Sequence, residues 1–385
     1  MSETFSIFRD LRDIDAAQWN SLASDHPLVR HEFLLALDQT GCAAAKTGWA
    51  PHYLLLHRDG RLAGAMPLYL KSHSRGEYVF DTGWARAFMQ HGLDYYPKLL
   101  ASIPFTPVPG PRLLAASHDD RVLLARQAIE LTRQNELSSL HILFPSHEDC
   151  EALRTAGFMF RENVQFHWHN RAYRDMDDFL ASMSQQKRKK LKQDRKKTQA
   201  AGVAFRWLQG DGINAKALEF FYECYCRTYY EHGNPPYLNF DFFTQLHRTM
   251  AGSMVLVVAE QNSEPIACAL NIRSADRLYG RYWGAVKFVS GLHFETCYMQ
   301  AIEFCIRHGL HAFEGGAQGE HKLSRGMLPV KTFSAHWIRD QRYAQAIADF
   351  LAQETAAIDD YVEVLEEHSP FKSTWQSAPA TGRQE

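Results

Sequence analysis

Residues 256–274, LVVAEQNSEPIACALNIRS, decide the fold because they can be laid without gaps on residues 54–72, LLLHRDGRLAGAMPLYLKS. Each stretch has an apolar run, a polar turn and a second apolar run, which is the pattern of a β-hairpin. Asp59-Gly60 is the expected tight-turn dipeptide of the first, and Asn262-Ser263, one position further along the alignment, is that of the second. The sequence therefore predicts two related hairpins.

A second match lies downstream of each hairpin. Residues 127–144, QAIELTRQNELSSLHILF, align with residues 300–317, QAIEFCIRHGLHAFEGGA, and both predict a helix followed by a short apolar strand. The first match is offset by 202 residues and the second by 173, so the first half holds about 29 extra residues. Chance identity in a common hairpin-then-helix order is the alternative. Two repeated α/β units agree better with matches that keep the same order.

The domain prediction follows from these matches. The first unit covers residues 1–170 and carries an insertion at 73–112 that is rich in aromatic and ionisable residues; the second covers 171–385. Long insertions in compact domains are often functional, although aromatic side chains there can also simply cover an apolar edge. The insertion thus becomes a candidate wall of a binding site.

Composition restricts the function classes. The 385 residues contain 42 Lys and Arg against 44 Asp and Glu, so the whole chain is no polycation for nucleic acid and any anion binding must be local. Seven scattered cysteines without CxxC spacing favour neither a disulfide framework nor a structural zinc site. The charged N-terminus and the absence of a long apolar stretch predict a cytoplasmic protein without stable membrane insertion.

A basic segment opens the second unit. Asp177 and Asp178 stand near the expected start of a helix, Gly202 is its expected stop, and eight of the eleven residues from Lys187 to Lys197 are Lys or Arg. A solvated helix face is one interpretation. The other is a docking surface for a polyanion such as tRNA, for a membrane or for an anionic cofactor.

Residues 314–326, EGGAQGEHKLSRG, are the main candidate for chemistry. The P-loop pattern fails there because His321 replaces a glycine and Leu323 replaces Ser or Thr, and GxSxG, HExxH and GxGxxG are missing from the whole chain. His167 and His169 would share a strand face, but no third metal ligand is evident, so no metal is expected. The stretch should instead leave the C-terminal end of a strand that finishes near Glu314, which favours an acid/base site over a plain surface turn.

In that stretch each charged residue has a candidate role. Glu314, Glu320 and His321 can accept a proton from an amine, whereas Lys322 can hold an anion or a developing oxyanion. The other candidates of this loop contact substrate, either through side chains or through the close backbone approach that glycines permit. They are Gly315, Gly316, Gln318 and Arg325.

Three motifs carry a family resemblance: SHSRGEYVFDTGWARAF, YYPKLLASIPFTPVPGPRLL and GAQGEHKLSRG. Together with the two α/β units and the basic helix, they resemble the FemAB-like branch of the GNAT superfamily, in a group labelled peptidoglycan biosynthesis/recognition. The resemblance covers most of the chain. It implies tandem GNAT-type units, each a mixed, mainly antiparallel sheet flanked by helices, with a cleft near their junction, and transfer of an acyl or aminoacyl group to an amine.

The resemblance also suggests donors and acceptors. Acyl-CoA and aminoacyl-tRNA are the two donor classes, and neither KFVSGLHF nor PVPGPRLLAASHDD matches the usual GNAT R/Q-x-x-G-x-G/A loop for the CoA pyrophosphate, so the donor stays open. The acceptor would be a small-molecule or peptide amine. Residues assigned to the acceptor side are Glu77, Tyr78, Asp81, Trp84, Tyr95, Tyr96 and Lys98, and those assigned to the donor are Lys187, Arg188, Lys190 and Lys196.

Two function hypotheses result. In the first, the protein is an N-acyltransferase in which Glu314 or His321 deprotonates the amine. In the second, the same residues form a non-catalytic surface that binds peptidoglycan precursors or another anionic ligand. The oligomeric state is not predicted by the sequence.

Overall fold

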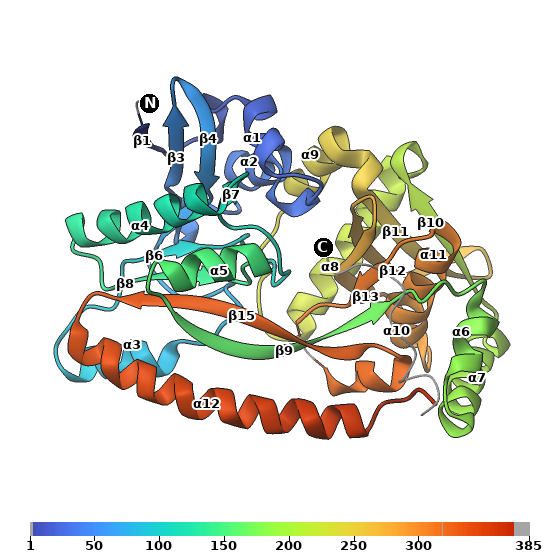
Figure 1. Cartoon of the computed structure of the whole chain (residues 1–385). Helices are drawn as coiled ribbons and strands as arrows, with labels where there is room; N and C mark the ends of the chain where they lie inside the picture. Colours follow the sequence, from blue (N-terminus) through green and yellow to red (C-terminus); the bar gives the residue numbers. More distant parts are fainter. Residues whose placement is uncertain (1–2, 318, 373–385) are drawn as a thin grey trace. The chain divides into compact units, whose positions relative to one another are not determined.

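The computed structural model describes residues 3–317 and 319–372, which belong to two compact units (Figure 1). Unit 1 comprises Met1–Asn163, Tyr237–Leu246 and Lys331–Asp360, and unit 2 comprises Val164–Pro236, His247–Val330 and Tyr361–Glu385. Two segments of the second half of the chain therefore belong to unit 1. The division into tandem repeats at residue 170 stays a proposal.

Unit 1 contains two groups of paired strands, ordered β1-β3-β4-β7 and β15-β8-β6-β5-β2. All these neighbours are antiparallel except β6 and β8, which are parallel. The strands are β1 (Glu3–Phe8), β2 (Trp49–Pro51), β3 (Tyr53–Arg58), β4 (Arg61–Met66), β5 (Leu68–Lys71), β6 (Lys98–Ala101), β7 (Leu114–Ala115), β8 (Ser139–Leu143) and β15 (Leu328–Ile338), of which β15 begins in unit 2. The helices are α1 (Ala16–Leu22), α2 (His31–Gln39), α3 (Thr82–Gln90), α4 (His118–Gln134) and α5 (His147–Thr155), with short 3-10 turns at Leu11–Asp13, Pro27–Val29 and Ala45–Thr47.

Unit 2 contains strands in the order β10-β11-β12-β13-β14-β9, in which only β13 and β14 are parallel. The strands are β9 (Met159–His169, which begins in unit 1), β10 (Val203–Gln209), β11 (Met254–Gln261), β12 (Glu264–Arg273), β13 (Arg277–Ala285) and β14 (Ala312–Glu314). The helices are α6 (Met176–Ser182), α7 (Gln185–Ala200), α8 (Ala215–Glu231), α10 (Leu292–Phe294) and α11 (Gln300–His308), with 3-10 turns at Gly210–Gly212, Ala251–Ser253 and Glu320–Arg325. Two helices run across the unit boundaries, α9 (Phe240–Met250) and α12 (Gln341–Glu367).

Both predicted hairpins are confirmed. β3 pairs with β4 through a turn in which Asp59 and Gly60 have φ of 49° and 78°, and β11 pairs with β12 through Asn262 and Ser263 at 54° and 65°. Left-handed φ at both central residues is typical of the two-residue turn whose twist matches antiparallel strands. The dipeptides chosen from the sequence therefore close the hairpins.

The predicted helix-then-strand units are confirmed as well. In unit 1, α4 leads into β8, and in unit 2 a helical segment at 292–308 leads into β14. We refer to residues 292–308 as the cavity helix. It consists of α10, a π-helical turn at Glu295–Met299 and α11. Each helix is the crossover that a parallel strand pair needs.

The prediction of a single basic helix from Asp177 to Gly202 is wrong, because the chain forms two helices there, α6 and α7. Met183 between them has an extended backbone and forms a bridge with Phe371, and the amide of Ser184 donates to the carbonyl of Pro370. These contacts replace helical hydrogen bonds. The expected stop at Gly202 is confirmed by its φ of 74° directly after α7.

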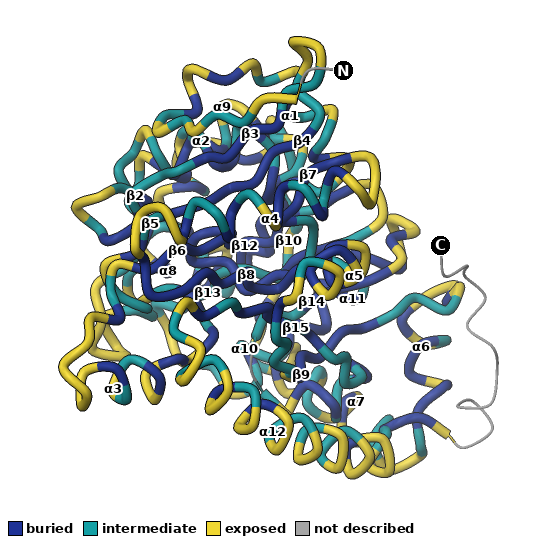
Figure 2. Tube along the Cα trace, turned by 60° about the vertical axis from the view of Figure 1, so that its left-hand side comes forward, coloured by how far each residue is buried: buried dark blue, intermediate teal, exposed yellow. Residues whose placement is uncertain are grey.

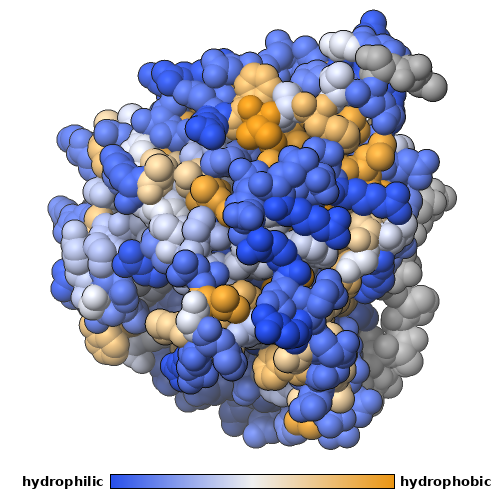
Figure 3. Space-filling model, turned by 90° about the vertical axis from the view of Figure 1, so that its left-hand side faces the viewer, coloured by the Kyte–Doolittle hydropathy of each residue, from blue (hydrophilic) through white to orange (hydrophobic). Residues whose placement is uncertain are grey.

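Burial follows the strands. Figure 2 shows β8 and its neighbours buried and much of α3 exposed. A core of unit 1 forms where α4 packs on β3 and β4, with Leu56, Leu124 and Ile129 among its buried side chains. The face drawn in Figure 3 is mainly hydrophilic, with separate small apolar areas, which is ordinary for a protein surface. Among the described residues, no helix combines the length and apolar character needed to cross a bilayer.

Candidate functional site

A cavity lies in unit 2 beside the point where the pairing of the parallel strands β13 and β14 ends. Their described pairing ends at Tyr279 opposite Glu314. Beyond this point lies a cavity of about 180 Å³ that backbone from β13, the loop after β14 and the cavity helix surround. Its lining residues are Ala269, Leu270, Asn271, Gly280, Arg281, Tyr282, Trp283, His293, Cys297, Tyr298, Phe313, Gly315 and Gly316.

Local sequence explains the opening. The register between β12 and β13 shifts so that Arg281 is an extra residue in β13, and bulges of this kind bend a strand and often lie beside active sites. On the other wall, a Cβ at Gly315 would lie 2.5 Å from Cε of Met327, so a larger residue there would have to displace the end of that side chain. Gly316 has φ of 84°, which favours glycine. Small residues therefore let the backbone border the cavity directly.

The loop after β14 brings two of the predicted residues, His321 and Lys322, into contact with lining residues of this cavity, and a third, Arg325, contacts His321. Nε2 of His321 lies 3.2 Å from the hydroxyl of Tyr298, a lining residue. Nζ of Lys322 donates to the carbonyl of Gly316 at 2.8 Å. The guanidinium of Arg325 lies 3.8 Å from the ring centre of Phe294 and donates to the carbonyl of His321.

The pKa values of these groups are shifted mainly by burial. Lys322 is 1% exposed, and desolvation lowers its pKa to about 8. Burial, together with the charges of Arg325 and Lys322, lowers the pKa of His321 below its usual value. Burial likewise raises the pKa of the Tyr298 hydroxyl. At neutral pH the site therefore combines a neutral imidazole with a lysine that loses its proton just above neutrality.

Glu314 lies apart from this group. Side chains alternate along a strand, so Glu314 faces the side of β14 opposite to Phe313, which lines the cavity. Its Oε1 accepts from Nη1 of Arg277 at 3.3 Å, and its Oε2 lies 4.0 Å from Nε2 of His167. Burial raises the pKa of Glu314 to about 7 and lowers that of His167 to about 3. The structure therefore does not bring the two predicted bases, Glu314 and His321, together.

Two further residues of the loop have other positions. Glu320 is exposed, and its Oε1 accepts from the hydroxyl of Tyr361 at 2.7 Å. Gln318 lies outside the described residues. Neither supplies a described side-chain contact to the cavity lining.

Sequence reasoning missed the residues that the cavity helix and β13 contribute. They are Arg281, Trp283, His293, Cys297 and Tyr298. His293 and Cys297 are four residues apart, which would place both on one helix face. The π-helical turn that also brings Tyr298 to the cavity had no sequence signal that we recognise.

A larger hollow of about 340 Å³ lies elsewhere in unit 2, lined by α7, β10 and the cavity helix. Its charged groups pair with one another. Arg195 donates to Glu295 at 3.1 Å and to Glu303 at 2.8 Å, and Glu303 also accepts from Arg307. We place the chemistry in the smaller cavity, because the groups of the larger one are already neutralised in pairs.

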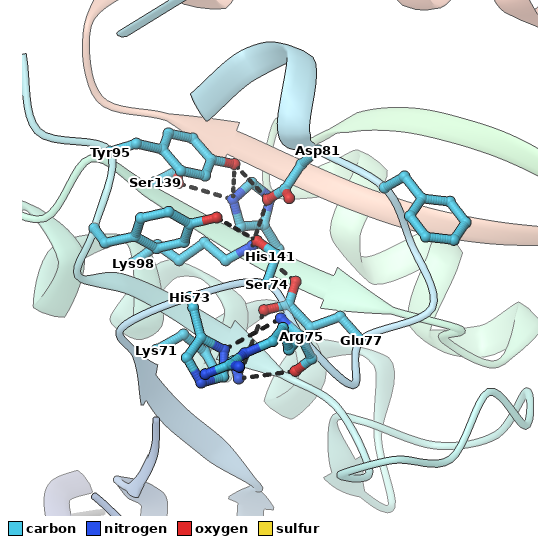
Figure 4. Close-up of polar contacts among 12 residues, drawn as sticks. Lys71, His73, Ser74, Arg75, Glu77, Asp81, Tyr95, Lys98, Ser139 and His141 are labelled. Carbon is cyan, nitrogen blue, oxygen red and sulfur yellow. Dashed lines mark hydrogen bonds and ion pairs between the residues drawn. The ribbon is translucent and has the colours of Figure 1, made fainter. Parts of the chain in front are cut away.

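The residues predicted for the acceptor side gather around Lys98 in unit 1 (Figure 4). Nζ of Lys98 donates to Glu77 at 2.8 Å, to Ser74 at 2.8 Å and to Asp81. Lys98 is 1% exposed and both carboxylates 3%. Burial opposes the ionisation of Asp81, but Lys98 outweighs it and the pKa of Asp81 is lowered, whereas the pKa of Glu77 is raised by burial.

The network continues from Asp81 into the sheet. The hydroxyl of Tyr95 donates to Asp81 at 2.7 Å and lies 3.1 Å from Nε2 of His141. Nδ1 of His141 lies 2.7 Å from Nδ1 of His336, whose ring packs edge-on against Trp84. Burial lowers the pKa of both histidines, so both are neutral at pH 7. These polar groups form hydrogen bonds and ion pairs with one another. Their predicted contact with an acceptor stays a proposal.

The remaining two members of this predicted set lie nearer the surface. Tyr96 is half-buried, and its hydroxyl lies 2.8 Å from Oγ of Ser74. Tyr78 is half-buried and has φ of 61°, a strained conformation for a bulky residue. Such strain is often found at functional positions.

The predicted donor residues lie on α7. Lys190 pairs with Asp194 at 3.5 Å. For the side chains of Lys187, Arg188 and Lys196, the described part of the chain offers no ion pair within 4.0 Å. Lys190 and Lys196 are exposed, so α7 presents an excess of positive charge to solvent.

Within residues 3–317 and 319–372, His, Cys, Asp and Glu side chains form no group of three or more that would hold a metal ion. His167 and His169 share a face of β9, as predicted, and pack beside Glu314 and His311 respectively.

The family model of FemAB-like proteins, described as peptidoglycan biosynthesis/recognition, matches residues 10–373. The chain belongs to the FemAB-like family. This membership was predicted from the sequence motifs and is confirmed. Among curated proteins, no sequence matches the chain.

Solved structures of FemAB-like and related proteins share the fold. A crystal structure of FemX has a TM-score of 0.56 at 12% identity and covers 90% of this chain and 100% of its own. The C-terminal domain of a lysylphosphatidylglycerol synthetase from Agrobacterium fabrum has 0.55 at 9%, covering 89% and 97%. L-PGS from Bacillus licheniformis has 0.51 at 11%, covering 86% and 97%. The predicted fold class, mixed and mainly antiparallel sheets flanked by helices, is confirmed.

Proposed function

We propose that this FemAB-like protein is an N-acyltransferase that moves an acyl or aminoacyl group from a thioester or ester carrier to a substrate amine in cell-wall metabolism. The observation that carries the proposal is the cavity beside the end of the β13–β14 pairing, which Tyr298 lines and next to which His321 and Lys322 lie. The family's printed description agrees with this setting.

The cavity suits an extended donor. The edge of β13 beyond Tyr279 is not paired with β14 and lines the cavity. An extended ligand that carries amide groups can add to such an edge as a further strand. Its carbonyl would then lie near Gly315 and Gly316, where small residues allow close approach.

His321 is the proposed base. Its exposed position admits an amine from solvent, and its lowered pKa keeps the imidazole neutral at pH 7, so it can accept a proton. The amine nitrogen then attacks the acyl carbonyl, the new C–N bond forms, and the bond from carbon to the carrier's sulfur or oxygen breaks. The carrier leaves as a thiol or alcohol with the proton that the base removed.

Lys322 is the proposed stabiliser of the tetrahedral oxyanion. It is fixed by the carbonyl of Gly316 in a buried position, where a charge acts more strongly than in water. Its pKa of about 8 keeps it mostly protonated at pH 7.

The proposed contact for an anionic carrier, CoA or tRNA, is the set of four predicted cations of α7, of which Lys190 and Lys196 are exposed and Lys187 and Arg188 half-buried. Changing Lys187, Arg188 and Lys196 together to Gln should weaken carrier binding by several-fold and flatten its salt dependence, since fewer counterions are released. Titrations at 50 and 200 mM salt measure both effects. An unchanged salt slope would remove α7 from the donor site.

The test of the proposed function uses His321→Ala and Lys322→Gln, with His232→Ala as a control at an exposed histidine that ends α8. Transfer to a panel of amines, including peptidoglycan stem peptides, is followed by mass spectrometry, and donor binding by thermal shift. We expect both site variants to lose about 10²- to 10⁴-fold in rate while still binding donor. If the unchanged protein binds a peptidoglycan precursor but neither it nor any variant transfers an acyl group, the non-catalytic alternative is favoured instead.

A further inference from the structure

The lining of the unit 2 cavity has an unusual charge balance. Among the described lining residues the only side chain with a permanent charge is Arg281, and no Asp or Glu is present. His293 is neutral, because burial and then the charges of His321, Arg325 and Lys322 lower its pKa to about 4. Cys297 is also neutral, since burial raises the pKa of its thiol. The cavity is therefore neutral to positive.

The nearest carboxylates are directed elsewhere. Glu314 is on the opposite face of β14 and bonds to Arg277. Glu295 is in the cavity helix but accepts from Arg195 and Gln300 outside the cavity. Glu320 accepts from Tyr361. None of these groups lines the cavity, so the described lining supplies no carboxylate to balance a cation, whereas Arg281 belongs to the lining and Lys322 bonds to the lining residue Gly316.

This charge balance of the lining distinguishes between aminoacyl groups and ordinary acyl groups. An aminoacyl group carries an amino group that is largely an ammonium near neutral pH, whereas an ordinary acyl group carries none. Moving an ammonium into a partly buried cavity without a counter-charge is costly, and like charges nearby add to the cost. A neutral or anionic acyl group meets neither penalty, and Arg281 would favour the anionic one.

We propose that the group transferred by this protein is a neutral or anionic acyl group rather than an aminoacyl group. The inference rests on the proposed function, because it assumes that the cavity holds the transferred group. The step itself is unchanged: the amine displaces the carrier from the acyl carbon, and the base passes the proton of the amine to the carrier, which leaves as a thiol or alcohol.

The test compares three thioesters on one minimal carrier, N-acetylcysteamine, so that recognition of CoA or tRNA does not enter. The butyryl and β-alanyl esters differ by a methyl in place of an ammonium, and the succinyl ester supplies a carboxylate. Binding is read as protection of Cys297, a lining residue, from alkylation by N-ethylmaleimide, resolved by peptide mass spectrometry. Transfer to hydroxylamine gives a second readout.

We expect butyryl and succinyl esters to protect Cys297 at concentrations at least about tenfold lower than the β-alanyl ester, given one unscreened like-charge contact. Equal or better protection by the β-alanyl ester would overturn the inference and leave the proposed function standing. If none of the three esters protects Cys297 or reacts, the proposed function itself fails.

A charge reversal sharpens the result. Arg281→Glu places a carboxylate at the cavity and should shift the preference towards the β-alanyl ester by about tenfold. Arg227→Glu is the matched control, because Arg227 lies on the exposed face of α8 and pairs with Glu231 rather than lining the cavity. If the ratio of the protecting concentrations of the β-alanyl and butyryl esters changes equally in both variants, general surface charge and not the cavity sets the preference.

Discussion

Both units contain a strand–helix–strand arrangement with a parallel strand pair, but they differ in what lies at the end of that pair. In unit 1 the parallel pair β6 and β8 is followed by a backbone bridge between Gly110 and Pro145, and the amide of Gly110 donates to the carbonyl of Phe144 at 3.0 Å. In unit 2 the pairing of β13 and β14 ends at Tyr279 and Glu314, and a cavity lies beside this end. Related topology thus yields a closed frame in one unit and a candidate site in the other.

Arg112 explains how unit 1 stays closed. It is 0% exposed, and its guanidinium donates to the carbonyls of Leu143, Val108 and Gly110 at 2.9, 2.7 and 3.1 Å. A side chain thereby occupies the hydrogen-bonding groups that border the end of β8. The comparison shows that the end of the parallel pair in unit 1 is filled by a side chain, whereas a cavity lies beside the end of the parallel pair in unit 2.

Removing the side chain of Arg112 should have the largest effect on the free energy of unfolding. Arg112→Ala leaves several buried carbonyls without a donor, each costing about 1–3 kcal/mol, so we expect a loss of about 5 kcal/mol in the free energy of unfolding. Urea denaturation measures it. Arg133→Ala, at an exposed arginine of α4, is the control and should change stability by less than about 0.5 kcal/mol. Equal midpoints for the two variants would mean that Arg112 does not hold unit 1 closed.

The buried network around Lys98 gives the next largest effect. Lys98→Met leaves the buried Asp81 without its cation and leaves Glu77 only Lys71, whose Nζ lies 3.8 Å from Oε1 of Glu77, which should cost about 3–5 kcal/mol at pH 7. The pH dependence should also reverse. In the native protein Asp81 has a lowered pKa, so its contribution exists above its unfolded pKa of about 4 and is lost on acidification.

In the variant both carboxyls would have raised pKa values, so their folded state is favoured when they are protonated. The deficit in stability should therefore shrink as the pH falls from 7 towards 4. Denaturation curves at several pH values test this. A deficit that is constant with pH would mean that the two carboxylates find another cation when Lys98 is absent.

Much of the fold was predictable because local signals dominate it. Asp59-Gly60 and Asn262-Ser263 close the hairpins wherever the strands lie, and Gly202 stops a helix by its own conformation. The break between α6 and α7 was not predictable from its own residues, because it depends on Pro370 and Phe371, nearly 190 positions away.

The candidate site was only partly predictable for a similar reason. The loop from Gly315 to Arg325 was identified from its composition and does border the cavity. Grouping Glu314 with His321 ignored strand alternation, which turns Glu314 away from Phe313 and the cavity. Cys297 and Tyr298 depend on a π-helical turn and on the bulge at Arg281, and neither feature has a reliable signature in a single sequence.

The rate–pH profile decides between the two bases that the structure separates. If His321 is the base, activity should fall on acidification with an apparent pKa below its usual 6.5. If Glu314 is the base, the fall should come near 7. In both cases the base must be deprotonated, so activity is lost as the pH decreases. His321→Ala should remove the acidic limb in the first case, with a loss of about 10²- to 10⁴-fold in rate, and Glu314→Gln should remove it in the second.

The comparison between the units can finally be tested by closing the cavity of unit 2. Cys297→Phe adds a ring to the cavity wall and should weaken binding of the butyryl thioester by at least about tenfold, because the ring fills space that the acyl group needs. Overpacking should cost no more than about 1–3 kcal/mol of stability, less if the ring enters empty space. Cys297→Ser, which conserves volume, is the matched control and should retain binding. Isothermal titration measures both affinities. If the Phe variant binds as tightly as the Ser variant, the acyl group does not occupy this cavity, and the open strand pair of unit 2 would be as purely structural as the closed one of unit 1.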